Sequence, residues 1–245
     1  MKKEENKNLE VCFSPANFPF YENKENSIIV IVDILRATTA ICTAFEYGVA
    51  KIIPVPSLQE TYKYKQNGYL IAGERDGKVI DGADFGNSPF NFMTENIKNK
   101  TVVITTTNGT QAIEMAKNCA EIYIGSFLNL NALCQLLIKK NKNVIILCAS
   151  WKNRFNLEDS IFAGAVCEIL QKKANYNLNC DSAMASLDLW LLAKNNILNY
   201  IEKSSHRHRL KKLLLDDVLE YCFTKNITNT IPVFKDNYLI DISKL

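Results

Sequence analysis

The strongest constraint on the fold comes from residues 27–32 (SIIVIV), which are apolar at successive positions and not only at alternate ones. A strand of this composition is stable where both faces of its sheet are covered, as in the parallel sheets of α/β proteins. Segments with helical periodicity separate it from further short apolar runs at 52–55, 69–73, 101–106, 121–124 and 144–148. This alternation predicts βα units, and therefore an α/β, three-layer fold around a largely parallel or mixed sheet.

The C-terminal part of the sequence is more helical than the rest. Apolar residues recur at helical spacing over residues 157–173, 182–193 and 209–222. Residues 230–234 and 238–241 predict a terminal β-hairpin. No linker or repeat interrupts the sequence, so we expect one domain over residues 1–245, with residues 1–10 as a poorly ordered N-terminal tail. Residues 78–92 lack periodicity, which is typical of a functional or mobile loop.

Composition and charge exclude several classes of protein. The formal net charge is only +3 and the basic residues are spread along the chain, which argues against a nucleic-acid partner. No apolar window is long enough to span a bilayer, and the N-terminus lacks a hydrophobic signal region. The eight cysteines form no CxxC pair and lie mostly in apolar runs, which favours reduced thiols. We therefore expect a cytoplasmic protein with no membrane partner.

One basic segment is denser than the rest, and it contains both histidines. His206 and His208 alternate with Arg207 and Arg209, and two lysines follow at 211 and 212. Such a segment is typical of a solvated helix face, with an anion-binding edge as the alternative. Because this segment is far from every predicted strand end, we expect neither a histidine nucleophile nor a zinc site.

Candidate functional residues follow the apolar strands directly. Ligands of open α/β sheets bind outside the carboxyl ends of the strands, so polar clusters at these points are the first candidates. Five clusters meet this criterion: Asp33 with Arg36, Thr38 and Thr39; Glu74, Arg75 and Asp76 between Gly73 and Gly77; Asp84 with Gly86, Asn87 and Ser88; residues 105–110; and Glu158 with Asp159.

Asp33 follows the strand at 27–32 and allows two interpretations. A carboxylate at the end of a buried strand is costly unless it is paired or bound to a cation. Arg36 could pair with it locally while Thr38 caps the next helix. Alternatively, Asp33 binds Mg²⁺ or attacks phosphorus, and Arg36 offers its guanidinium fork to an oxyanion.

Residues 105–110 (TTTNGT) form the best candidate phosphate-binding loop. The hydroxyls of Thr106, Thr107 and Thr110, the Asn108–Gly109 turn and a following helix N-terminus direct several donors to one place. The alternative is an ordinary βα turn in which Asn108 and Gly109 supply positive φ and a threonine caps the helix. No GxxxxGK[ST] motif occurs, which argues against a nucleotide triphosphatase.

The acidic residues Glu74, after an apolar strand, and Glu158 with Asp159 also allow two interpretations. Glu158 and Asp159 begin a predicted helix, where acidic residues are common because they suit the helix dipole. Carboxylates from several loops would nevertheless suit Mg²⁺, which keeps several waters and takes few protein ligands.

Taken in order, these clusters resemble the 2-phosphosulfolactate phosphatase family. The matching stretches are VDILRATTA (32–40), AGERDG (72–77), DFGNSP (84–89), TTTNGT (105–110), GSFLN (125–129) and FNLEDSIFAG (155–164). The resemblance implies Mg²⁺-dependent hydrolysis of (2R)-phospho-3-sulfolactate to 3-sulfolactate and phosphate, a step toward coenzyme M. The sequence departs from the family pattern at residues 149–152 (ASWK), where a glycine-bearing turn is expected.

The resemblance also implies roles for individual residues. The implied catalytic residues are Asp33, Arg36, Glu74 and Arg75, the implied substrate-binding or phosphate-binding residues are Thr38, Thr39, Thr106, Thr107, Asn108, Gly109, Thr110 and Ser126, and the implied metal ligands are Asp33, Glu158 and Asp159. We expect a small anionic phosphoester as substrate, with a metal ligand or base role for Asp33. A haloacid-dehalogenase-type nucleophile needs a second aspartate two positions on, where this chain has Leu35.

Two other functions fit the same residues. One is a non-catalytic anion-binding or phosphate-binding regulatory protein. The other is a broad phosphomonoesterase with no preference for a sulfonate. The oligomeric state is left open between a monomer and a homo-oligomer.

Overall fold

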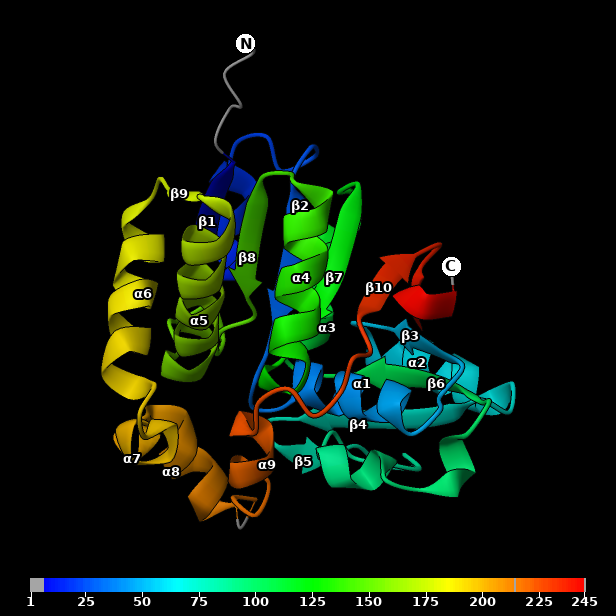
Figure 1. Cartoon of the computed structure of the whole chain (residues 1–245). Helices are drawn as coiled ribbons and strands as arrows, with labels where there is room; N and C mark the ends of the chain where they lie inside the picture. The colour runs from blue at the N-terminus through cyan, green and yellow to red at the C-terminus, as the bar shows by residue number, and fades with distance from the viewer. Residues whose placement is uncertain (1–6, 214, 245) are drawn as a thin grey trace.

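The computed structural model describes residues 7–213 and 215–244 and has one mixed sheet with helices on both faces (Figure 1). The α/β class predicted from the apolar runs is confirmed. The strands are β1 (Asn8–Cys12), β2 (Ile28–Val32), β3 (Lys51–Pro54), β4 (Leu70–Arg75), β5 (Lys78–Val79), β6 (Thr101–Thr105), β7 (Glu121–Gly125), β8 (Val144–Cys148), β9 (Asn177–Leu178), β10 (Pro232–Lys235) and β11 (Tyr238–Asp241). Their order across the sheet is β5-β4-β6-β3-β11-β10-β7-β2-β8-β1-β9.

Two sets of parallel strands make up most of this sheet, and the hairpin β10–β11 joins them. At one edge, β5 pairs antiparallel with β4. Strands β7, β2, β8, β1 and β9 are parallel to one another, as are β3, β6 and β4. β10 pairs antiparallel with β7, and β11 pairs antiparallel with β3. Figure 1 shows the strands of the first set upright and β4 and β6 lying across them. The predicted terminal hairpin is therefore confirmed, and it lies inside the sheet and not at an edge.

The continuous apolar run at β2 is buried on both faces, as predicted. Ile28, Val30 and Val32 belong to one core, whereas Ile29 and Ile31 belong to the other. Helices cover each side. The α-helices are α1 (Ala37–Glu46), α2 (Leu58–Gln66), α3 (Gly109–Ala116), α4 (Leu130–Lys140), α5 (Leu157–Ala174), α6 (Asp181–Ala193), α7 (Ile197–Ile201), α8 (Ser205–Lys212) and α9 (Leu219–Phe223). Side chains of α4, α5 and α6 fill the first core, and those of α1 and α3 fill the second.

The predicted helix at 209–222 is wrong, because two helices with a turn between them occupy this region. At the end of α8 the Leu215 N–H donates to the Leu210 carbonyl (2.9 Å), which reverses the chain. The Asp216 carboxylate then lies 2.9 Å from the Arg207 guanidinium and fixes the reversal. This turn ends α8 at Lys212, and the buried side of the helix holds His206 and Leu210.

The tail predicted for residues 1–10 is also wrong where the structure describes it. Residues 8–10 begin β1, and Leu9 is fully buried where it pairs with Val144 of β8. This strand is short, and its parallel pairing with β8, which no local pattern reveals, supplies much of its stability. Residues 1–6 of the predicted tail lie outside the described residues.

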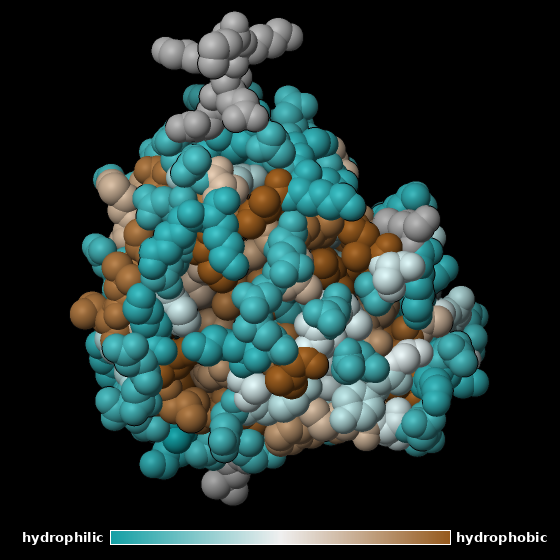
Figure 2. All heavy atoms as spheres, in the orientation of Figure 1, coloured by the Kyte–Doolittle hydropathy of each residue, from teal (hydrophilic) through white to brown (hydrophobic). Residues whose placement is uncertain are grey.

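The loop predicted at 78–92 has short regular pieces, namely β5 and the 3₁₀ turn at Pro89–Phe92. Its backbone is tied to β4, because the Gly73 N–H donates to the Phe85 carbonyl (3.0 Å) and the Asp84 N–H donates to the Ile71 carbonyl (2.9 Å). Figure 2 shows hydrophilic side chains over much of this face of the molecule, with hydrophobic ones at its left margin over α6 and in patches nearer the middle. On α6, Met184, Leu191 and Leu192 are exposed.

The contact between α5 and α6 depends on Gly164. A Cβ at this position would lie 1.9 Å from the Ser186 carbonyl oxygen and 2.7 Å from the Trp190 Cβ. Because both neighbours belong to a helix that cannot retreat without losing core contacts, Gly164→Ala should lower the free energy of unfolding by about 3 kcal/mol or more. Urea denaturation measures this. Gln171→Ala, at an exposed position of α5, is the control and should change stability by about 0.5 kcal/mol at most. An equal effect of both substitutions would contradict the packing described.

Candidate functional site

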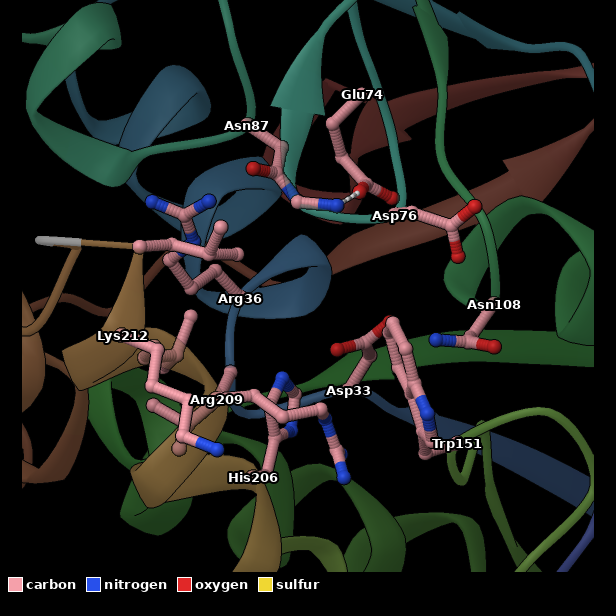
Figure 3. Close-up of a pocket in the computed structure, with 14 residues that line it drawn as sticks. Asp33, Arg36, Glu74, Asp76, Asn87, Asn108, Trp151, His206, Arg209 and Lys212 are labelled. Atoms are coloured by element: carbon pink, nitrogen blue, oxygen red, sulfur yellow. Dashed lines mark hydrogen bonds between the residues drawn. The ribbon is translucent and has the colours of Figure 1, made fainter.

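A cavity of about 240 Å³ lies where the carboxyl ends of β2, β4, β6 and β8 converge (Figure 3). Helix α8 lies across the opposite side. The lining residues are Asp33, Leu35, Arg36, Glu74, Asp76, Gly77, Asn87, Asn108, Trp151, His206, Arg209, Leu210, Lys212 and Leu213. The strand-end rule therefore predicted where the cavity lies. The residues of the candidate clusters that line it are Asp33, Arg36, Glu74, Asp76, Gly77, Asn87 and Asn108.

The turn from β2 into α1 positions Asp33 and Arg36 at the cavity. The Thr38 hydroxyl accepts a hydrogen bond from the Asp33 N–H (3.0 Å), and the Thr39 hydroxyl donates to the Ile34 carbonyl (2.9 Å). Both threonines are buried and neither lines the cavity. They hold the turn, so the substrate contacts predicted for them are not seen.

Ser126, a further predicted binding residue, lies deeper still. Its hydroxyl accepts from the Leu128 N–H (3.2 Å) and caps the turn at Phe127–Asn129. The side chain is fully buried and is not part of the cavity wall.

Asp33 is a buried carboxyl group with little hydrogen bonding. Its Oδ1 accepts a long bond from the Ala37 N–H (3.4 Å), and within residues 7–213 and 215–244 no hydrogen bond reaches Oδ2. Burial raises the pKa of Asp33 to about 8, and the neighbouring Asp159 adds to the shift. A cation in the cavity would stabilise the ionised form of this group.

Arg36 faces the same cavity and leaves its guanidinium available. The local Asp33–Arg36 ion pair, the first interpretation of this motif, does not form: within the described residues no ion pair or hydrogen bond reaches the Arg36 guanidinium. Burial lowers the pKa of Arg36, but a guanidinium stays protonated in proteins. Arg36 is therefore a buried cation available for an anionic ligand.

Most of the TTTNGT segment has the structure of a βα turn. The Thr110 N–H donates to the Thr106 hydroxyl (3.1 Å), and the Thr106 N–H donates to the Thr110 hydroxyl (3.2 Å). Gly109 is needed for close approach, because a Cβ there would lie 2.6 Å from the Ala37 Cβ and 3.0 Å from the Asp33 Oδ2. Only Asn108 lines the cavity, so the predicted hydroxyl-rich phosphate loop is not seen.

Glu74 and Arg75 point in different directions. The Glu74 carboxylate accepts from the N–H groups of Thr107 and Gly77, both at 2.7 Å, and this fixes the β6 loop against the end of β4. The Arg75 guanidinium turns away from the cavity and donates to the Thr105 hydroxyl (2.6 Å). Glu74 lines the site, and Arg75 supports the wall behind it.

Glu158 and Asp159 are fully buried at the start of α5, beneath the cavity floor. The Asp159 carboxylate accepts from the N–H groups of Ile34 (2.9 Å) and Ser150 (3.3 Å). The Glu158 carboxylate lies 2.5 Å from the His206 Nδ1. Because their oxygens are engaged and neither lines the cavity, the predicted ligand set of these two residues with Asp33 is not assembled around one point.

Helix α8 contributes the residues that the sequence analysis missed. His206 is buried, and Arg209 and Lys212 line the same cavity. The expectation that the histidines lie away from every strand end is wrong for His206. The reason is a contact at the start of α8: the Ser204 hydroxyl donates to the Glu158 carboxylate (3.4 Å), and this holds the start of the helix over the strand ends. The inner face of the basic segment lines the cavity, while His208 and Lys211 are exposed. Anion binding by this face stays a prediction.

One sequence signal could have revealed this face. Residues 206, 209, 210 and 213 are spaced as one side of a helix, and all four line the cavity. Two of them are basic or titratable and two are leucines, so the face is amphipathic and not uniformly charged.

Trp151 lies on the β8 loop, where the sequence departs from the family pattern. Ser150, Lys152 and Asn153 all have positive φ (59°, 50° and 60°), a conformation that glycine adopts at no steric cost. The Trp151 ring lies 5.5 Å from the His206 ring and 4.3 Å from the Arg209 guanidinium carbon. The loop thus places an aromatic wall against α8.

The cavity fits Mg²⁺ better than a metal that needs a full protein cage. Within the described residues no group of three or more His, Cys, Asp or Glu side chains is arranged to hold a metal. Mg²⁺ binds through one or two carboxylates together with substrate oxygens and water. The free Oδ2 of Asp33 meets this requirement, and Asp33 is the group that would hold the ion.

Fold and site together define an α/β protein with a strand-end pocket whose charges suit a small anionic ligand. Residues 12–237 match the family model described as 2-phosphosulpholactate phosphatase. A Thermotoga petrophila protein named probable 2-phosphosulfolactate phosphatase is 38% identical over 86% of this chain and 90% of its own. Proteins of the same name from Caldanaerobacter subterraneus and Clostridium tetani are each 33% identical, over 87% and 95% of this chain and 89% and 99% of their own.

The chain therefore belongs to the 2-phosphosulfolactate phosphatase family, a family of phosphoric monoester hydrolases. The resemblance seen in the sequence motifs is confirmed. Across residues 7–213 and 215–244, no helix has the length and apolar character needed to cross a membrane.

The raised pKa of Asp33 predicts a pH-dependent stability. The native protein keeps this proton up to about pH 8, whereas the unfolded chain loses it near pH 4. The stability contribution is therefore complete below about pH 4 and is lost as the pH rises toward 8. Asp33→Asn removes this loss, so in EDTA its Tm advantage over wild type should grow by roughly a few degrees between about pH 5 and about pH 8.

Asp188→Asn removes an exposed carboxylate of α6 and is the matched control. Its Tm should follow that of wild type across the same range. A constant difference between Asp33→Asn and wild type would contradict the assignment of a raised pKa to Asp33.

The positive φ of Ser150 predicts a stabilising substitution. A left-handed conformation costs a non-glycine residue roughly 1–2 kcal/mol, and the buried Ser150 hydroxyl has no hydrogen-bond partner within the described chain. Ser150→Gly keeps the N–H that Asp159 accepts, so it should raise the free energy of unfolding by about 1 kcal/mol. Urea denaturation measures this. Asn99→Gly, at an exposed position with φ of 58°, is the control and should show no gain, because asparagine tolerates this conformation.

Proposed function

We propose that this protein is a Mg²⁺-dependent phosphatase that hydrolyses 2-phosphosulfolactate, or a closely related phosphorylated hydroxy acid, to the hydroxy acid and phosphate. The family and the names of the relatives support this substrate. The observation that carries the proposal is the distribution of charge in the cavity: Asp33 lies on the β2 side, whereas Arg36 and the α8 cations Arg209 and Lys212 line the same space.

This distribution suits a substrate with more than one anionic group. The phosphate would lie next to Asp33 and Asn108, where Figure 3 shows the Asn108 side-chain amide and the Asp33 carboxyl group on the same side of the cavity. The second anion, a sulfonate or carboxylate, would then face Arg36, Arg209 and Lys212. Charge-assisted hydrogen bonds from such groups are roughly twice as strong as neutral ones.

The residues of this chain contribute mainly by positioning and by electrostatics. Mg²⁺, when bound, would neutralise charge on the phosphate oxygens and polarise phosphorus. Asp33 would hold the ion in place. Arg36 is buried at the cavity wall, so its guanidinium would meet the second anion with little reorganisation. Trp151, Leu210 of α8 and Leu213 just after this helix would limit the access of water to the phosphate.

A panel of small phosphoesters, assayed with Mg²⁺ and with EDTA, tests the proposal. We expect phosphate release only with Mg²⁺, and a higher kcat/KM for phosphosulfolactate than for phospholactate. A broad phosphomonoesterase would treat the two substrates alike. If wild-type protein with Mg²⁺ releases phosphate from none of them, the enzymatic proposal fails and the anion-binding regulatory function takes its place.

Lys212→Gln tests the second-anion subsite. Lys212 lines the cavity, and its loss should raise the KM for phosphosulfolactate about tenfold, because one charge-assisted contact is removed. The KM for p-nitrophenyl phosphate, which has no second anion, should change by less than about threefold. Lys211→Gln is the matched control, because Lys211 is the exposed neighbour that does not line the cavity. Equal effects of both substitutions on the two substrates would exclude a subsite at Lys212.

A further inference from the structure

His206 and Glu158 form a buried pair beside the cavity. The His206 Nδ1 lies 2.5 Å from the Glu158 Oε1, which is a short and strong contact. Glu158 is fully buried, and His206 is 7% exposed. Burial by itself would raise the pKa of Glu158, but the charge and hydrogen bond of His206 outweigh it and hold this pKa below its usual value. The geometry suits a carboxylate that accepts a hydrogen bond from an N–H at His206 Nδ1.

Glu158 has several contacts that fix its orientation. Its Oε2 accepts from the Ser204 hydroxyl (3.4 Å), and its Oε1 accepts from the Asn156 amide (3.3 Å). Ser204 in turn caps the start of α8 by accepting from the Arg207 N–H (3.1 Å). The carboxylate, the cap and the imidazole are thus parts of one hydrogen-bonded unit, and the His206 ring cannot rotate without breaking it.

The second ring nitrogen of His206 is left for the cavity. His206 lines the cavity, and no hydrogen bond within residues 7–213 and 215–244 reaches its Nε2. Figure 3 shows the ring projecting from α8 toward the side on which Asp33 lies. Trp151 packs against the ring at 5.5 Å between centroids and limits its exposure to water. A histidine with Nδ1 oriented by a carboxylate and Nε2 facing a ligand pocket has the arrangement of a general acid or base.

We propose that His206 is the catalytic acid of this site, donating its Nε2 proton to the leaving-group oxygen of the phosphoester, and that Glu158 is its positioning residue. The proposal rests on the phosphatase function proposed above. The family motifs in the sequence do not include His206, and none of them assigns it a role. The proposal also gives Glu158 a function other than the predicted metal ligation.

The proton and electron balance of this step is complete. The bond between phosphorus and the ester oxygen breaks with its electron pair on oxygen, and that oxygen takes the Nε2 proton to become the hydroxyl group of the hydroxy acid. A new bond forms between phosphorus and the oxygen of an attacking water, which gives dihydrogen phosphate. Neutral His206 then regains a proton from this product or from solvent.

An acid is needed because of the leaving group. The ester oxygen of a hydroxy acid leaves as an alkoxide, which is far more basic than a phenolate, so its departure depends strongly on protonation. A positioned acid typically contributes about 10²–10⁴-fold to such a reaction. An aryl phosphate with a good leaving group, such as p-nitrophenyl phosphate, needs little of this help.

The test compares substrates with different leaving groups. In Mg²⁺-supplemented assays, His206→Asn should lower kcat for phosphosulfolactate about 10²–10⁴-fold but kcat for p-nitrophenyl phosphate less than about tenfold. Glu158→Gln should lower kcat in the same direction by a smaller factor. His208→Asn is the matched control on the same helix, because His208 is exposed and does not line the cavity. It should leave both rates unchanged.

A second measurement keeps the test decisive if the variants do not fold. For wild-type protein, the dependence of kcat/KM on the leaving-group pKa across a series of substituted phenyl phosphates should be shallow, because the acid offsets leaving-group basicity. An equal loss of rate on both substrates in His206→Asn, or a steep dependence in wild type, would overturn the role of His206 while the phosphatase function stands. A wild-type protein inactive on every substrate would instead overturn the proposed function, and this proposal with it.

Discussion

Asp159 accepts hydrogen bonds from the backbone N–H groups of Ile34 and Ser150 and from the Asn156 amide, at 2.9, 3.3 and 2.8 Å. These donors lie on three different segments: the turn after β2, the loop after β8 and the residue before α5. A carboxylate without such donors could not be buried here, because its desolvation would cost several kcal/mol. The geometry of the candidate site depends on this group, since it fixes the turn that presents Asp33 and the loop that presents Trp151.

Burial also disfavours the ionised forms of the acidic groups at this site. Burial raises the pKa of Asp33, and burial together with Glu158 raises the pKa of Asp159. The nearby His206 of α8 acts in the opposite direction on the pKa of Asp33. A cation in the cavity would therefore stabilise the ionised form of Asp33.

The sequence predicted the parts of this structure that depend on local patterns. The successive apolar residues of β2 revealed a doubly covered strand, and the strand-end rule found Asp33, Arg36 and Asn108. The roles of the threonines were not predictable, because a hydroxyl that caps a turn and one that faces a ligand have the same sequence signature. His206 was missed because its position depends on a contact with Glu158, 48 residues away in the chain. The helical spacing of residues 206, 209, 210 and 213 indicates an amphipathic face, but it does not say against which part of the chain that face packs.

The hairpin β10–β11 has a consequence for how this chain folds during synthesis. It follows every other strand in chain order, yet it pairs with β7 on one side and β3 on the other. Until these residues leave the ribosome, both parallel sets have an open edge with unpaired backbone groups, and such edges promote aggregation. A chain that ends before residue 232 would lack the hairpin that joins the two parallel sets, and the edges of β3 and β7 would stay open.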